Sequence, residues 1–179
     1  MANRGRHSRA DVRYHSKGVP REMHIRQANN RDREAITALV FSVLREYGLE
    51  PDPDGIDSDL EDIERSYFAR GGKLFVLEQE RGGIAGTYGL HPINEETCEL
   101  RKMYLRATAR GRGLGKRMLE DAISRAREMG YREITLETAS PLIEAIGLYK
   151  RFGFVRYANP HLCWRCDQAY RLDLARRTQ

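Results

Sequence analysis

The 179-residue chain lacks any long apolar run, and it is poor in cysteine. Without about 18 consecutive apolar residues, no membrane-spanning helix is predicted, and no apolar stretch follows the basic start as in a secretory signal. Three cysteines, Cys98, Cys163 and Cys166, are too few for a disulfide framework. With 40% apolar and 32% charged residues, the composition is typical of a globular domain, and a cytoplasmic location is expected.

The net charge of +5 is concentrated in the first 22 residues, which carry six basic and two acidic side chains. The remainder of the chain therefore carries a net charge of about +1 and does not need a polyanionic partner. A basic segment without apolar periodicity is typical of disorder. We therefore expect a disordered tail over residues 1–21 and one folded domain over 22–179, with no membrane partner and with nucleic acid disfavoured.

Hydrophobic periodicity and turn residues predict alternating strands and helices in the order βααβββαβαββ, which is an α/β domain with a mixed sheet. The second helix is expected to begin at the capping box Ser58-Asp59-Leu60-Glu61. The predicted strands cover 23–28, 73–80, 84–90, 97–105, 134–139, 154–157 and 169–174, and the predicted helices cover 31–47, 58–71, 114–129 and 141–152.

The segment Arg110–Lys116 (RGRGLGK) follows a predicted strand and opens a predicted helix. Helix N-termini present free N–H groups to phosphates, and glycines let an anion approach the backbone. The segment fits neither the Walker pattern nor the Rossmann pattern. It fits R-x-x-G-x-G through Arg110, Gly113 and Gly115, although a turn without a ligand remains the alternative.

This turn resembles the acyl-CoA pyrophosphate loop of the GNAT N-acetyltransferase superfamily. Three further segments resemble that family: residues 25–28 its first strand, residues 98–105 its fourth strand, and 148–154 its L-Y-x-x-x-G-F motif. The resemblance covers about residues 22–175. It implies a mixed, mostly antiparallel sheet flanked by helices, and transfer of acetyl from acetyl-CoA to a primary amine by direct attack in a ternary complex, without a metal.

The resemblance also implies two sets of cofactor-binding residues. Leu142 stands where many members have an asparagine, so one side-chain contact to pantetheine is expected to be lost. Backbone groups of the strand would pair with the pantetheine arm. Backbone N–H groups of Arg112 through Lys116 would hold the pyrophosphate, and Arg110 and Gly111 would shape the turn. The strand residues are Met103, Tyr104 and Leu105; the turn residues are Arg110, Gly111, Arg112, Gly113, Leu114, Gly115 and Lys116.

Acetyl transfer to an amine needs a proton donor for the CoA thiolate and a base for the ammonium. Tyr149 is the candidate acid, with a structural core tyrosine as the alternative. Glu99 is the candidate base because histone-acetylating members resemble this chain there, although it could instead pair with Arg101 or Lys102. Glu137 on the next strand is the reserve candidate, and a chain of waters is a third.

Nine carboxylates and no lysine or arginine occur between Glu46 and Glu64. If this stretch rims the acceptor pocket, it would attract a cationic amine; otherwise it is a solvated acidic loop with charges matched to helix dipoles. Residues 161–166 contain His161, Cys163 and Cys166, which could suggest a metal clip. Structural zinc needs four ligands, so a loop entering the last strand is favoured.

The alternative function is an acyl-CoA-binding sensor without turnover, whose basic tail contacts a nucleic acid or a protein. The sequence leaves open the acceptor amine, small molecule or peptide, the acyl-chain length, and whether the chain forms a homodimer.

Overall fold

A computed structural model describes residues 23–79 and 82–175. The basic segment 1–21, with its expected disorder, lies outside these described residues. None of the described helices combines the length and apolar character that crossing a bilayer requires.

The described residues form a seven-stranded sheet in the order β1-β2-β3-β4-β5-β7-β6. Only β4 and β5 pair in parallel, so the sheet is mixed and mostly antiparallel, as predicted. The strands are β1 Met23–Gln27, β2 Lys73–Gln79, β3 Ile84–Pro92, β4 Thr97–Leu105, β5 Glu133–Thr138, β6 Val155–Tyr157 and β7 Gln168–Asp173; the helices are α1 Arg33–Glu46, α2 Ile63–Ser66, α3 Leu114–Glu128 and α4 Ile143–Arg151.

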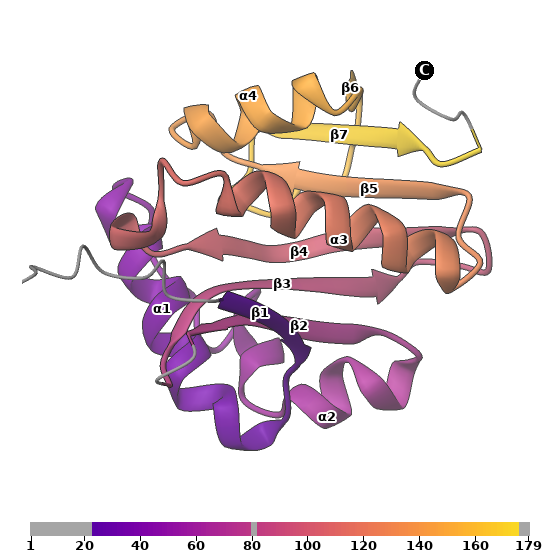
Figure 1. Ribbon diagram of the computed structural model, residues 1–179. Coiled ribbons are helices and arrows are strands. Elements are labelled where there is room, and N and C mark those ends of the chain that lie inside the picture. Colours follow the sequence, from indigo (N-terminus) through magenta and orange to yellow (C-terminus); the bar gives the residue numbers. More distant parts are fainter. Residues whose placement is uncertain (1–22, 80–81, 176–179) are drawn as a thin grey trace, which may run out of the picture.

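Helices cover both faces of the sheet and bury two apolar clusters. One cluster includes residues of α3 and α4, such as Met118, Leu119 and Tyr149. The other includes residues of α1 and α2, such as Leu39 and Ile63. In Figure 1, α3 crosses in front of the central strands. The helical spacing of apolar residues therefore serves to dock each helix on one face of the sheet.

The predicted capping box at Ser58 is wrong. The Ser58 hydroxyl donates to the Gly55 carbonyl, at 2.6 Å, and residues Ser58–Leu60 form only a 3₁₀ turn. The helix α2 begins later, because the Asp62 carboxylate accepts from the Arg65 backbone N–H at 3.0 Å. An aspartate that can satisfy a free N–H of the first turn is as good a cap as serine.

A β-bulge interrupts β4 at Lys102, which has a φ of 51°. On the neighbouring strand Gly89 pairs with Arg101 and Thr87 pairs with Tyr104, so two β4 residues oppose one β3 residue. The extra residue reverses the alternation of side chains. Met103 therefore joins the cluster under α3 and α4, and Tyr104 joins the cluster under α1.

The side chain of Lys102, the bulge residue, lies in a buried ionic network. The Lys102 ammonium donates to the Asp57 carboxylate at 2.7 Å and lies 3.2 Å from Asp59. Arg165 donates two further hydrogen bonds to Asp57, at 2.9 and 3.0 Å. The Asp57 side chain has no exposed area, so its charge is stabilised by these partners rather than by water. Three segments far apart in the chain meet at this carboxylate.

We expect Asp57→Asn to lower the free energy of unfolding by about 3 kcal/mol, because it removes the carboxylate that two buried cations share and leaves Lys102 with Asp59 alone. Burial raises the pKa of Asp57, but Arg165 and Lys102 outweigh it and lower this pKa from 3.8 to about 2. The stabilisation is therefore present above about pH 4 and is lost as the pH falls toward 2. Urea titrations between pH 2 and 7 measure both effects.

The matched control is Asp54→Asn, at an exposed position of the same loop. Equal stabilities of the two variants at pH 7 would show that the buried network contributes nothing.

Candidate active site

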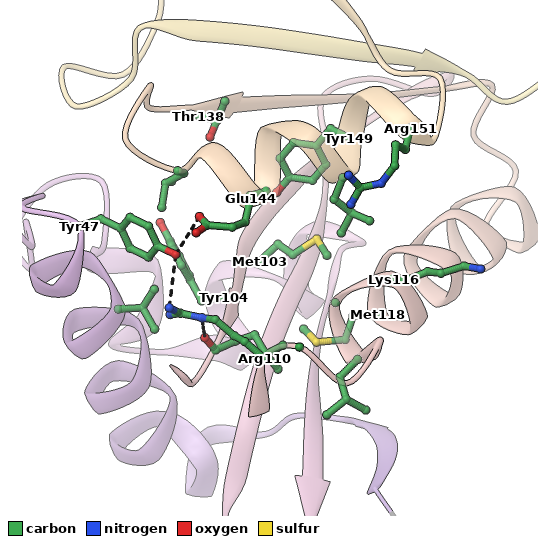
Figure 2. A pocket seen from close by; sticks show the side chains of 18 of the residues that line it. Tyr47, Met103, Tyr104, Arg110, Lys116, Met118, Thr138, Glu144, Tyr149 and Arg151 are labelled. Atoms are coloured by element: carbon green, nitrogen blue, oxygen red, sulfur yellow. Dashed lines mark hydrogen bonds between the residues drawn. The ribbon is translucent and has the colours of Figure 1, made fainter. Parts of the chain in front are cut away.

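A cavity opens where β4 and β5 separate. The two strands pair only from Thr97–Glu133 to Glu99–Thr135, so the later part of β4 runs beside β5 without a ladder. The space has a volume of about 350 Å³. It lies between these strands and the ends of three helices, as Figure 2 shows. Its walls come from α1 and the residue after it (Val43, Tyr47), β4 (Met103–Leu105), the turn and start of α3 (Arg110, Gly111, Gly113–Lys116, Met118), β5 (Glu137, Thr138), and α4 with the residue before it (Leu142, Glu144, Ala145, Leu148, Tyr149, Arg151).

The glycine-rich turn forms one wall of the cavity. Gly111 and Gly113 have φ values of 73° and 74°, which side-chain-bearing residues rarely adopt. A Cβ atom at either position would have nothing within 4 Å, so backbone conformation rather than crowding requires glycine there. No side chain caps the N-terminus of α3, which leaves N–H groups free for an anion.

Arg110 holds the turn against the strand and α1. Its Nε donates to the Leu105 carbonyl at 3.0 Å, and its guanidinium pairs with both carboxylate oxygens of Glu46. It also donates to the Tyr47 hydroxyl at 3.3 Å, and Tyr47 in turn donates to Glu144 at 3.1 Å. Figure 2 shows the contacts of Tyr47 with Arg110 and with Glu144 at the cavity. Arg110 thus ties the turn to the end of β4 and to the end of α1.

Nine of the ten expected cofactor residues line the cavity. The exception is Arg112, which is exposed. Leu142, at the position of the missing asparagine, also lines the cavity. Burial raises the pKa of Tyr104 to about 12, so its phenol is neutral at physiological pH.

Tyr149 projects from α4 beside the same cavity (Figure 2). Only 5% of the residue is exposed, and its ring packs against Phe154 at a centroid distance of 5.7 Å. Burial raises the pKa of Tyr149, which keeps the proton on its oxygen. The structure records no hydrogen bond from this hydroxyl to any other described residue. The oxygen therefore retains its donor for a ligand.

The two candidate bases differ in position. Glu99 accepts from Arg101 at 2.6 Å and does not line the cavity, whereas Glu137 does. The Glu137 carboxylate is held by the Asn159 amide at 2.7 Å and by the Cys163 backbone N–H at 2.8 Å. The structure therefore brings the reserve candidate, rather than Glu99, to the cavity that holds Tyr149.

Comparison with known proteins identifies the family of the chain. The model of the acetyltransferase (GNAT) family matches residues 37–154. The chain belongs to this family. Membership makes the protein an acetyl-CoA-dependent acyltransferase, and it confirms the resemblance carried by the glycine-rich turn.

Relatives and solved structures agree with this assignment. The chain is 36% identical over 141 residues to the uncharacterized N-acetyltransferase YjgM of Escherichia coli, covering 76% of this chain and 84% of the relative. A GNAT acetyltransferase structure from Staphylococcus aureus superposes with a TM-score of 0.81 at 24% identity, covering 86% and 99% of the two chains. YncA of Salmonella typhimurium, whose structure includes its cofactor acetyl-CoA, gives 0.67 at 22% identity, covering 88% and 97%.

Several carboxylates of the acidic stretch, residues 46–64, pair with other groups of this GNAT protein. Asp57 is buried in the ionic network, Glu46 pairs with Arg110, and Asp52 accepts from the Trp164 indole at 2.8 Å. Asp62 caps α2. These four of the nine carboxylates therefore have partners within the chain, so the stretch does not form a wholly uncompensated negative rim.

Sequence reasoning missed a cross-link in the loop before β7. Cys163 and Cys166 form a disulfide, although three cysteines predicted none. The reason is that a three-residue separation allows a local bond within one turn, which needs no framework. Glu137 brings a carboxylate near these sulfurs, but both sulfurs are bonded to each other and are not thiolate ligands. The expectation of a loop entering the last strand holds, because β7 begins at Gln168.

We expect Gly113→Asp to abolish the rise in melting temperature that acetyl-CoA gives the wild type. At about 100 times its Kd, a ligand that binds only the folded state adds about 2.7 kcal/mol to stability. The substitution places a carboxylate where phosphate must approach and forces an L-residue to a positive φ. Differential scanning fluorimetry with and without acetyl-CoA measures the shift.

The control is Gly130→Asp, because Gly130 also has a positive φ, of 91°, and open space around it. It follows the other end of α3 and should keep the shift. A folded Gly113→Asp protein with the full shift would contradict the phosphate assignment.

Proposed function

We propose that the protein transfers the acetyl group of acetyl-CoA directly to a primary amine bound in the same cavity. The observation that carries this proposal is that the glycine-rich turn and the free Tyr149 hydroxyl line one cavity. The pyrophosphate would bind to backbone N–H groups at the start of α3. The pantetheine arm would lie along the unpaired part of β4, at Met103 to Leu105, as an added strand.

Holding both substrates in one cavity supplies much of the catalysis, because the reaction between them becomes effectively unimolecular. The amine nitrogen attacks the thioester carbonyl, the C–N bond forms, and the C–S bond breaks as the electron pair leaves with sulfur. Tyr149 is the proton donor to that sulfur. Its raised pKa keeps it protonated until the thiolate develops.

For the base we propose Glu137, with Glu99 as the alternative. A carboxylate at the cavity wall can accept the ammonium proton directly or through one water. The two hydrogen bonds that Glu137 receives fix its orientation. Glu99 lies on β4, outside the cavity wall, and forms an ion pair with Arg101. This pairing favours a structural role.

The acceptor is a cationic amine in this proposal. Both Glu137 and Glu144 contribute carboxylates to the cavity wall, and charge complementarity would retain an ammonium ion before its deprotonation. The sensor without turnover finds no support, since the cavity retains the tyrosine and the intact turn that transfer requires.

The first test is a panel of cationic, neutral and anionic amines, with the acetylated product detected by mass spectrometry. We expect acetylation of cationic amines, and we expect Tyr149→Phe to lower kcat for the best of them about ten- to a thousandfold, as loss of a general acid does. The KM for acetyl-CoA should change little because the ring is kept.

The matched control is Tyr131→Phe, since Tyr131 packs against the same apolar cluster but does not line the cavity. Equal kcat values for the wild type and Tyr149→Phe would make Tyr149 a core residue, and acetylation of no amine would remove the proposed function.

pH–rate profiles distinguish the two candidate bases, Glu137 and Glu99. Glu137→Gln should lower kcat/KM near neutral pH and move its rise to higher pH, where the amine is already deprotonated. Glu99→Gln should overlay the wild-type profile. The opposite pattern would assign the base to Glu99, and two unchanged profiles would assign it to water.

A further inference from the structure

The loop between β6 and β7 carries the Cys163–Cys166 disulfide, which brackets Trp164 and Arg165. Both cysteines are partly exposed, so a small reductant can reach the bond. Disulfides that are accessible and local are the ones that thiols exchange most readily. The two bracketed residues are therefore the part of the chain that such an exchange affects first.

Trp164 and Arg165 fasten the loop between α1 and α2. The Trp164 indole donates to Asp52 at 2.8 Å, and Arg165 donates to the Glu50 carbonyl at 2.8 Å as well as to Asp57. The two aspartates organise the loop in turn. Asp57 accepts from the Asp52 N–H at 3.0 Å, and Asp52 accepts from the Ile56 N–H at 3.2 Å.

The same turn also touches the cavity wall. The Cys163 N–H is one of the two donors that hold Glu137, and Arg165 shares Asp57 with the bulge residue Lys102. The next two residues of β4, Met103 and Tyr104, line the cavity. A change in the turn can therefore shift the Glu137 carboxylate at the cavity wall and the part of β4 that borders the cavity.

We propose that Cys163 and Cys166 form a reversible redox site whose state sets how firmly residues 50–57 are held beside the cavity. The co-reactant is a dithiol. Its two electrons and two protons break the S–S bond and yield two thiols, while the dithiol becomes a disulfide; reoxidation by a disulfide reverses the exchange. Once opened, the turn no longer presents Trp164, Arg165 and the Cys163 N–H in one fixed arrangement.

The third cysteine does not share this chemistry. Cys98 is fully buried in β4, and burial raises the pKa of its thiol to about 12. It therefore stays protonated and inaccessible, because the thiolate is the reactive form. This cysteine supplies a control within the same chain.

The test compares the full-length protein before and after treatment with dithiothreitol. Alkylation of the native protein followed by mass spectrometry should add two labels, at Cys163 and Cys166, only after reduction. Trp164, the sole tryptophan of the chain, reports the turn by its fluorescence. Amide hydrogen exchange over residues 52–57 reports the loop, and we expect about three- to tenfold faster exchange in the reduced form.

Two variants separate the site from general effects of the reductant. The double variant Cys163→Ser/Cys166→Ser should show fast exchange in residues 52–57 with or without dithiothreitol. Cys98→Ala should respond as the wild type does.

An effect on catalysis rests on the proposed function. With the best amine of the panel, reduction should raise the KM for the amine about three- to tenfold, with product measured by mass spectrometry because thiol reagents would react with dithiothreitol.

The redox proposal is overturned if the untreated protein already alkylates at both cysteines, or if exchange and Trp164 fluorescence are the same in both states. Failure of every amine to react would instead remove the proposed function, because the alkylation, fluorescence and exchange measurements need no acceptor.

Discussion

The separation of β4 from β5 after three residue pairs is the constraint on which the site depends. It leaves backbone groups of β4 unpaired at the wall of a cavity, and such groups need a partner. The bulge at Lys102 contributes by turning Met103 toward one face of the sheet and Tyr104 toward the other. In water these groups are solvated. In the enzyme's working state an amide-containing cofactor can replace that water.

The bulge is costly in itself, because a lysine with a positive φ is strained. Its side chain is also buried, with 7% of its area exposed. Asp57 compensates for both by accepting from Lys102 on β4 and from Arg165 in the loop before β7. One carboxylate thus stabilises the strand, the loop after α1 and the loop before β7. This explains why the acidic stretch is a structural element more than an electrostatic surface.

Much of the fold followed from local patterns in the sequence. The apolar periodicity of α1 and α3 and the glycine-rich turn before Leu114 are local signals, and the structure follows them. The helix start at Asp62 was missed because Ser58 and Asp62 both suit a cap, and only tertiary packing decides between them. As candidate base, Glu137 was placed behind Glu99 in the sequence analysis for a similar reason. Glu99 is in the last pair of the parallel ladder and Glu137 follows that pair on β5. Which of them lines the cavity with Tyr149 therefore depends on where the ladder ends. The bond between Cys163 and Cys166 depends on the shape of one turn, which composition does not record.

The pairing of Arg110 with Glu46 has a consequence for how the enzyme attracts its cofactor. The Arg110 guanidinium is already neutralised and Lys116 lies 3.6 Å from Glu120, whereas Arg112 in the turn is exposed. An anion that arrives at the start of α3 therefore meets oriented peptide dipoles together with the charge of Arg112. Both attractions weaken as salt is added.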